Sequence, residues 1–206
     1  MQDANDKNKD IESLTYMFEK LKEIKCPCYS ILGNHDLKMM DSVKEVEEIM
    51  GYDSSTYSVD AEGFHLVFLT TEIRPELGLA RGGCYKAHYL SEQSIAWLKS
   101  DLENNQLPCL IFTHYALADD DEINDECMFM KNRADVKEII KNNKNILAVF
   151  SGHTHRTKRY VEDGVIYYVL GSLIGCHEAN GVPDGVYFEV DLKDGKINVT
   201  EHHIEI

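Results

Sequence analysis

The sequence predicts one mixed α/β domain. Amphipathic helical patterns alternate with short apolar runs through about residue 150, and the rest of the chain is rich in strand-like segments. Of the 206 residues, 43% are hydrophobic, which is enough for one substantial core. Neither an internal repeat nor a linker-like stretch divides the sequence, so we expect residues 1–206 to form a single domain.

The elements of the first half follow from hydrophobic periodicity. A polar stretch without periodicity predicts a loop at residues 2–10. Apolar residues then recur every three or four positions, as on one face of a helix that ends ahead of a proline. In order, we predict a helix from Ile11 to about Ile24, a strand at Tyr29–Leu32, a helix from about Ser42 to Met50 and a strand at Phe64–Leu69.

A long aperiodic stretch with three glycines separates the two halves, from Arg74 to Tyr89. A loop of this length in a compact domain is usually functional. Arg81 and His88 in this stretch are candidate substrate contacts, although the sequence favours loop residues without a functional role for both. His65, inside a predicted strand, is expected to be structural.

Helical and strand patterns resume at Ser91, which is a good N-cap residue. Asp194-Gly195 is a turn signal between the last two strands. In order, we predict a helix starting at Ser91, a strand at Pro108–Phe112, a solvated acidic loop at Asp119–Glu122, a helix at about Arg133–Lys141, and strands at Ile146–Phe150, Val165–Leu170, Val186–Val190 and Ile197–Thr200.

Charge and cysteine usage narrow the class of protein. The formal net charge is −15, from 36 acidic and 21 basic residues, so the chain repels nucleic acid and anionic membranes, and neither is expected as a partner. No apolar run approaches the ~18 residues of a membrane span, and no signal peptide is visible. The six cysteines contain no C-x-x-C pair, which favours reduced thiols in a cytoplasmic protein over a zinc-thiolate site.

Histidine or asparagine follows three of the predicted strands within two to four residues. Gly33-Asn34-His35-Asp36 follows the first of these strands, Thr113-His114 the second, and Gly152-His153-Thr154-His155 the third. Sites in open α/β sheets form at the carboxyl ends of strands, and neutral imidazole is the commonest protein metal ligand. The sequence therefore predicts a metal site at this edge of the sheet.

These motifs, in this order on an α/β scaffold, resemble the calcineurin-like metallophosphoesterase family. The resemblance covers Gly33 to His155 and implies a four-layer α/β-β/α sandwich with a dinuclear metal centre between its two sheets. The stretch from Cys127 to His155 is more loosely similar to the manganese-dependent ADP-ribose/CDP-alcohol diphosphatase branch. That similarity implies a small phosphorylated substrate such as a nucleotide diphosphate derivative.

The resemblance also implies a role for each motif residue. Asn34, His114 and His153 would bind one metal, and His155 would bind the other. The mixed nitrogen and oxygen donors suit two divalent or trivalent ions of Mn, Fe, Zn or Co. Two such ions can activate a hydroxide that attacks a phosphomonoester, phosphodiester or pyrophosphate bond.

Two further residues are implied to act on the phosphate without binding metal. His35 would face the phosphate and either stabilise charge or protonate the leaving oxygen. Asp36 would orient His35 by accepting its other ring proton.

Two motifs of the family pattern, D-x-H and G-D-x-x-D, do not occur ahead of Gly33. We therefore expect an N-terminally truncated domain that lacks its first strands, the bridging aspartate and two ligands of the second metal. Three readings remain open: a metal-dependent phosphoesterase, a non-catalytic remnant that holds at most one metal, and a binding domain whose histidines are structural.

Overall fold

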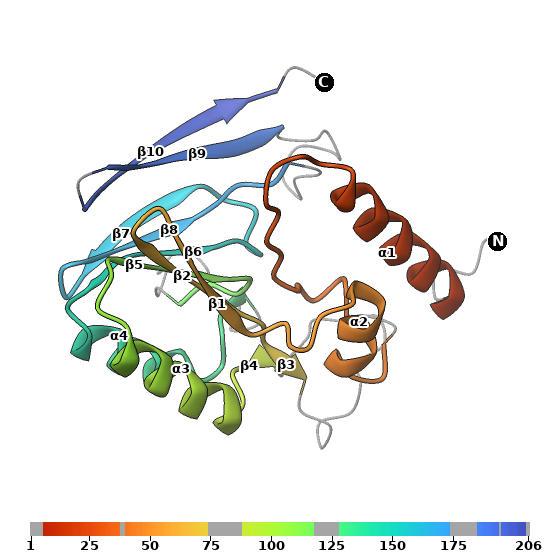
Figure 1. Ribbon diagram of the computed structural model, residues 1–206, viewed down its shortest axis with the longest axis horizontal. Helices are drawn as coiled ribbons and strands as arrows, with labels where there is room; N and C mark the ends of the chain where they lie inside the picture. Colours follow the sequence, from red (N-terminus) through yellow and green to blue (C-terminus); the bar gives the residue numbers. More distant parts are fainter. Residues whose placement is uncertain are drawn as a thin grey trace.

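The computed structural model describes residues 6–37, 40–73, 88–117, 128–173, 185–193 and 195–204. Its helices are α1 (Lys7–Lys22), α2 (Val43–Met50), α3 (Glu92–Asn104) and α4 (Arg133–Asn142). Its strands are β1 (Tyr57–Ala61), β2 (Phe64–Leu69), β3 (Glu72–Ile73), β4 (His88–Tyr89), β5 (Cys109–Thr113), β6 (Ile146–Ser151), β7 (Lys158–Glu162), β8 (Val165–Val169), β9 (Val186–Lys193) and β10 (Lys196–His203). The predicted mixed α/β class is confirmed (Figure 1).

A six-stranded sheet with the order β1-β2-β5-β6-β8-β7 forms the centre of the molecule. The four inner strands β2, β5, β6 and β8 run parallel, and the outer strands β1 and β7 run antiparallel to their neighbours. Parallel strands present their carboxyl ends at the same edge. Consequently the segments that follow β5 and β6 leave the sheet next to each other.

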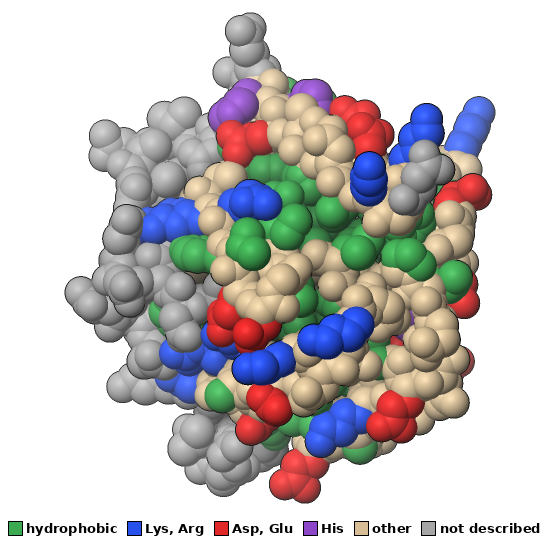
Figure 2. Space-filling model, turned by 90° about the vertical axis from the view of Figure 1, so that its left-hand side faces the viewer, with side chains coloured by type: hydrophobic (Ala, Val, Ile, Leu, Met, Phe, Trp, Pro, Cys, Tyr) green, Lys and Arg blue, Asp and Glu red, His purple; other side chains and the backbone are tan. Residues whose placement is uncertain are grey.

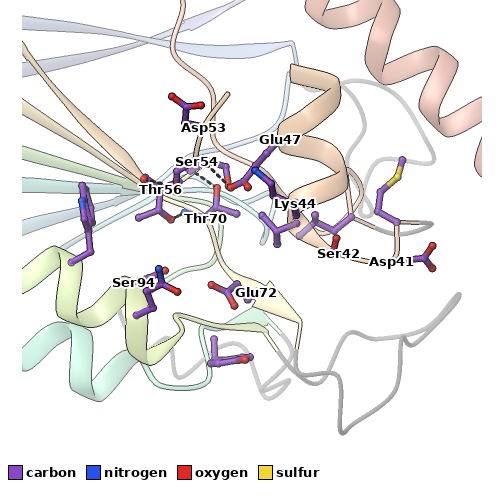
Figure 3. A pocket seen from close by; sticks show the side chains of 17 residues that line it. Asp41, Ser42, Lys44, Glu47, Asp53, Ser54, Thr56, Thr70, Glu72 and Ser94 are labelled. Atoms are coloured by element: carbon purple, nitrogen blue, oxygen red, sulfur yellow. Dashed lines mark hydrogen bonds between the residues drawn. The ribbon is translucent and has the colours of Figure 1, made fainter. Parts of the chain in front are cut away.

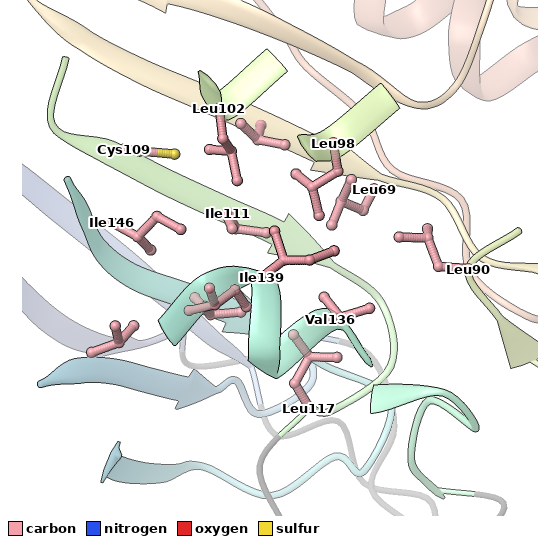
Figure 4. Close-up of a cluster of buried hydrophobic side chains, with 14 of the residues drawn as sticks. Leu69, Leu90, Leu98, Leu102, Cys109, Ile111, Leu117, Val136, Ile139 and Ile146 are labelled. Atoms are coloured by element: carbon pink, nitrogen blue, oxygen red, sulfur yellow. The ribbon is translucent and has the colours of Figure 1, made fainter. Parts of the chain in front are cut away.

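One face of this sheet is covered by α3 and α4, which lie below the sheet in Figure 1. The hydrophobic cluster between these helices and the sheet is mostly aliphatic and mostly buried, and only Ile95, Trp97 and Tyr160 among its described members are partly buried (Figure 4). Ile111 and Leu98 are 0% exposed and Val149 is 1% exposed. We call this side the helix-covered face.

The other face is covered by the β9–β10 hairpin, which lies above the sheet in Figure 1. Only Leu110, Ala148 and Phe150 are fully buried in the cluster beneath it. Its remaining members are only partly buried: Leu66, Phe112, Leu147, Ile166, Tyr168, Leu170, Val190, Leu192, Ile197 and Val199. Figure 2 looks onto the end where the β9–β10 turn lies and shows a band of apolar side chains open to solvent. We call this side the hairpin-covered face.

Five aromatic rings form a ladder across the hairpin-covered face. Each ring occupies the register position opposite the next, and neighbouring centroids are 4.8–5.2 Å apart with nearly parallel planes. On β7, the Arg159 guanidinium lies 5.9 Å from the last ring. From β1 to β8 the rings are Tyr57, Phe68, Phe112, Phe150 and Tyr168. The ladder fixes the register of five strands immediately before two of them reach the predicted site.

Helices α1 and α2 pack against each other in a separate cluster that includes Leu14, Phe18 and Val46. The prediction of a loop up to residue 10 is wrong, because α1 begins at Lys7. Asp6 caps this helix by accepting a hydrogen bond from the backbone N–H of Asn8. The first turn is thus stabilised by capping, which hydrophobic periodicity does not report.

The strand predicted at Tyr29–Leu32 is also wrong, since the segment belongs to no sheet. Side chains replace the missing ladder: the Tyr57 hydroxyl donates to Ser30 O at 3.0 Å and accepts from Ser30 N at 2.9 Å. Leu32 N donates to Thr70 Oγ1 at 3.3 Å. An apolar run is a strand only when a neighbouring strand accepts its backbone hydrogen bonds.

The remaining predicted elements are confirmed, apart from parts that lie outside the described residues. The acidic loop at Asp119–Glu122 and residues 74–87, including Arg81, belong to those parts. Four short strands were missed: β1, β3, β7 and β4, which contains His88. Within the described segments, no helix is long and apolar enough to cross a membrane.

Candidate metal centre

Three side chains from three separate segments meet at the edge where β5 and β6 end. His114 Nε2 lies 2.8 Å from Asn34 Oδ1 and 3.2 Å from His153 Nδ1. Asn34 is only 4% exposed, and both imidazoles are half-buried. This is the trio that the sequence predicted for one metal.

The close approach of these segments depends on the absence of a side chain at Gly33 and is reinforced by a backbone hydrogen bond at Gly152. A Cβ on Gly33 would lie 2.9 Å from His114 Cε1, so a larger residue cannot stand there without moving the ring. Gly152 N donates to the backbone oxygen of His114 at 3.0 Å, which ties the two strand exits together.

The two histidines of the last motif have unusual backbones. His153 has φ 65° and His155 has φ 57°, both in the left-handed region that few non-glycine residues adopt. The same kink brings the His153 ring within 4.2 Å of the Tyr115 ring, measured between centroids. Tyr115 is fully buried and was not predicted as part of the site, although it directly follows His114.

His155 joins His114 and His153 in lining a pocket of about 330 Å³. The floor of this pocket is mostly apolar and includes Phe112 and Phe150 of the aromatic ladder. The site therefore lies directly beyond the hairpin-covered face of the sheet.

His35 and Asp36 are placed differently from each other. The His35 side chain is exposed, whereas Asp36 is half-buried and accepts a hydrogen bond from Gly33 N at 2.7 Å. Burial raises the pKa of Asp36, and the backbone bond from Gly33 opposes that rise. Within the described residues no hydrogen bond joins Asp36 to His35, and Gly33 N donates to one carboxylate oxygen of Asp36, so the orienting role of Asp36 stays a prediction.

The trio fits a single metal ion. Ligand atoms that bind one ion at about 2.0–2.2 Å lie roughly 3 Å from one another, which matches the separations of His114 Nε2 from Asn34 Oδ1 and from His153 Nδ1. One amide oxygen and two imidazole nitrogens form a borderline donor set suited to Mn, Fe, Co or Zn. Across the described ranges no group of three or more His, Cys, Asp or Glu side chains could hold a metal, so a metal bound by these two histidines would need the Asn34 amide as a further donor.

His65 is structural, as predicted, and lies outside this site. It is 3% exposed, and its two ring nitrogens lie 2.6 Å from Asp60 Oδ1 and 2.8 Å from Asp101 Oδ2. Burial acts to lower the pKa of His65, but the hydrogen bonds to the two carboxylates outweigh it and raise the pKa.

A parallel sheet whose strand ends gather nitrogen and oxygen donors is typical of α/β metalloenzymes. The chain belongs to the calcineurin-like phosphoesterase family: the family model matches residues 4–157. Family membership implies divalent metal cofactors.

Individual relatives are more distant. A probable cyclic nucleotide phosphodiesterase from Xenorhabdus bovienii is 26% identical over 148 residues, which are 71% of this chain and 56% of the relative. An uncharacterized protein of Acanthamoeba polyphaga mimivirus is 30% identical over 109 residues, 48% of this chain and 38% of that protein. The chain thus spans about half the length of its curated relatives or less.

The fold is similar to that of a solved dimetal phosphatase from Danio rerio. The two superpose with a TM-score of 0.59 at 18% identity, covering 80% of this chain and 67% of the other.

Proposed function

We propose that this chain belongs to a metal-dependent phosphoesterase that hydrolyses a phosphomonoester, phosphodiester or pyrophosphate bond. The convergence of Asn34, His114 and His153 carries the proposal, because these residues are 39 or more positions apart and meet within 3.2 Å. Family membership supports the same chemistry.

In this proposal the trio holds one ion and His155 contributes to a second. The two ions, of Mn, Fe, Zn or Co, would supply an activated hydroxide and neutralise phosphate charge. His35, whose exposed ring is accessible to a substrate, stabilises charge on the phosphate or protonates the leaving oxygen. Asp36 fixes the turn that presents His35 through its bond to Gly33 N.

A second candidate is a non-catalytic form that holds one metal. Two observations favour it: no carboxylate in the described segments joins the trio in a metal-binding group, and the second sheet consists of the β9–β10 hairpin alone in those segments.

Metal titration separates these candidates. We expect Mn²⁺ to raise the melting temperature of the wild type, with about 2.7 kcal/mol of stabilisation at roughly 100 times the Kd. His114→Ala should abolish the shift, whereas His202→Ala, on the exposed β10 strand, should retain it. Calorimetric melting curves with and without Mn²⁺ provide the measurement.

Metal content and turnover decide between the outcomes. Two ions per chain with hydrolysis of p-nitrophenyl phosphate or bis(p-nitrophenyl) phosphate would establish the enzyme. One ion without turnover would establish the second candidate. An unchanged melting curve would overturn both and leave the histidines structural.

The substrate class is also a proposal. The name of the Xenorhabdus relative supports a small nucleotide derivative, and so does the looser resemblance to ADP-ribose/CDP-alcohol diphosphatases. Comparing a cyclic nucleotide with a nucleotide diphosphate derivative would test this assignment.

A further inference from the structure

A second pocket, larger than the one beside His114, lies apart from the metal centre. Its volume is about 940 Å³, and none of its lining residues lines the pocket beside His114. It opens between α2, the end of β2, β3 and the start of α3 (Figure 3). A volume near 1,000 Å³ is typical of pockets for small organic ligands.

The pocket carries a net negative charge. Four carboxylates line it, from Asp41, Glu47, Asp53 and Glu72, and the lining includes the ammonium of Lys44. The Asp41 carboxylate is also paired with Lys7, so the uncompensated charge comes chiefly from the other three. Figure 3 shows Glu47 reaching in from α2 and Glu72 from β3. This balance repels phosphate, so the pocket is unsuited to the phosphorylated substrate of the proposed function.

Glu47 is a buried carboxylate whose two oxygens differ in their hydrogen bonding. Glu47 is only 9% exposed. Its Oε1 atom accepts hydrogen bonds from Ser55 N at 2.7 Å and from Ser55 Oγ at 2.9 Å. Among the described residues, no hydrogen bond reaches Oε2. A buried carboxylate is costly unless it is paired, and one oxygen of Glu47 is held rigidly while the other remains available to a cation.

Aromatic and hydroxyl groups complete the lining. Trp97 and Tyr89 contribute the aromatic surface, which attracts organic cations through the ring quadrupole. The hydroxyl groups belong to Ser42, Ser54, Ser55, Thr56, Thr70 and Ser94. We propose that this pocket binds a small organic amine, with its ammonium between Glu47 and Glu72 and its apolar body against Trp97.

The proposal is testable by fluorescence because Trp97 is the single tryptophan of the chain. Tyramine is the probe, and 4-hydroxyphenylacetate, with the same ring and the opposite charge, is its matched counterpart. Tyramine should change the Trp97 emission saturably, and 4-hydroxyphenylacetate should not.

Three variants locate the ammonium. Glu72→Gln and Glu47→Gln should each weaken tyramine binding about tenfold, the effect of losing one favourable charge interaction. Glu48→Gln removes the same charge from an exposed position of α2 and should bind like the wild type. If Glu47→Gln fails to fold because Ser55 loses its acceptor, Glu72→Gln still tests whether a carboxylate of this pocket binds the ammonium.

Three results would overturn the proposal. They are the absence of a saturable change with tyramine, equal binding of both probes, and equal affinity of Glu72→Gln and Glu48→Gln. None of them bears on the metal centre, because the pocket shares no residue with it.

Discussion

The two faces of the central sheet are built from the same strands and differ in how completely they are covered. Among the described residues, two helices bury most of the helix-covered face, and the β9–β10 hairpin leaves most residues of the hairpin-covered face partly exposed. Helices that cross several strands shield a wide surface, whereas a two-stranded hairpin shields a narrow one. We infer from this difference that most of the folding stability comes from the helix-covered face, while the candidate metal centre and its pocket border the other.

The largest expected effect compares two isoleucines on opposite faces. Ile111→Ala, on the helix-covered face, should lower the free energy of unfolding by about 3–4 kcal/mol, because it removes a fully buried side chain and leaves a cavity. Ile166→Ala, on the hairpin-covered face, should cost about 1–2 kcal/mol, since that side chain is already partly exposed. Urea unfolding measures both, and equal losses would contradict the comparison.

A smaller effect concerns the polar rim of the helix-covered face, where His65 joins Asp60 of β1 to Asp101 of α3. Because the folded pKa of His65 is raised, its stabilisation is complete below pH about 6.5 and is lost as pH rises through the folded pKa. His65→Gln should therefore cost about 1–2 kcal/mol at pH about 5.5 and less at pH about 9.

Unfolding of the wild type and His65→Gln at both pH values provides the measurement. His202→Gln on the exposed hairpin serves as the control. A loss of stability that does not vary with pH would show that His65 acts through packing alone.

The smallest expected effect probes the hairpin-covered face through its aromatic ladder. Phe112→Leu keeps an apolar side chain but removes the stacking on Phe68 and Phe150. We expect a loss of about 1 kcal/mol in unfolding free energy. A loss as large as that of Ile111→Ala would mean that this face carries far more of the stability than its exposure indicates.

Local signals predicted much of the fold. Ser42 and Ser91 cap α2 and α3 as their side chains allow, and the apolar runs of β2, β5 and β6 are buried strands. The strand ends of β5 and β6 also predicted the meeting of His114 and His153, because adjacent parallel strands leave the sheet together.

The wrong predictions concern segments whose hydrogen-bond partners are distant in the sequence, and a missed hairpin that has a local turn signal. Tyr29–Leu32 has the composition of a strand, but its hydrogen-bond partners are the side chains of Tyr57 and Thr70. The β7–β8 hairpin was missed although Asp163-Gly164, both with positive φ, is a turn signal. The bond from Gly33 to Asp36 depends on turn geometry that the family pattern does not specify.

The contact between Gly33 and the His114 ring links two positions that are 81 residues apart in the chain. Because a Cβ at position 33 would meet the imidazole at 2.9 Å, the two positions cannot vary independently while the ring stays in place. We therefore expect the two positions to co-vary. Relatives that carry a larger residue at the position of Gly33 should also have replaced the histidine.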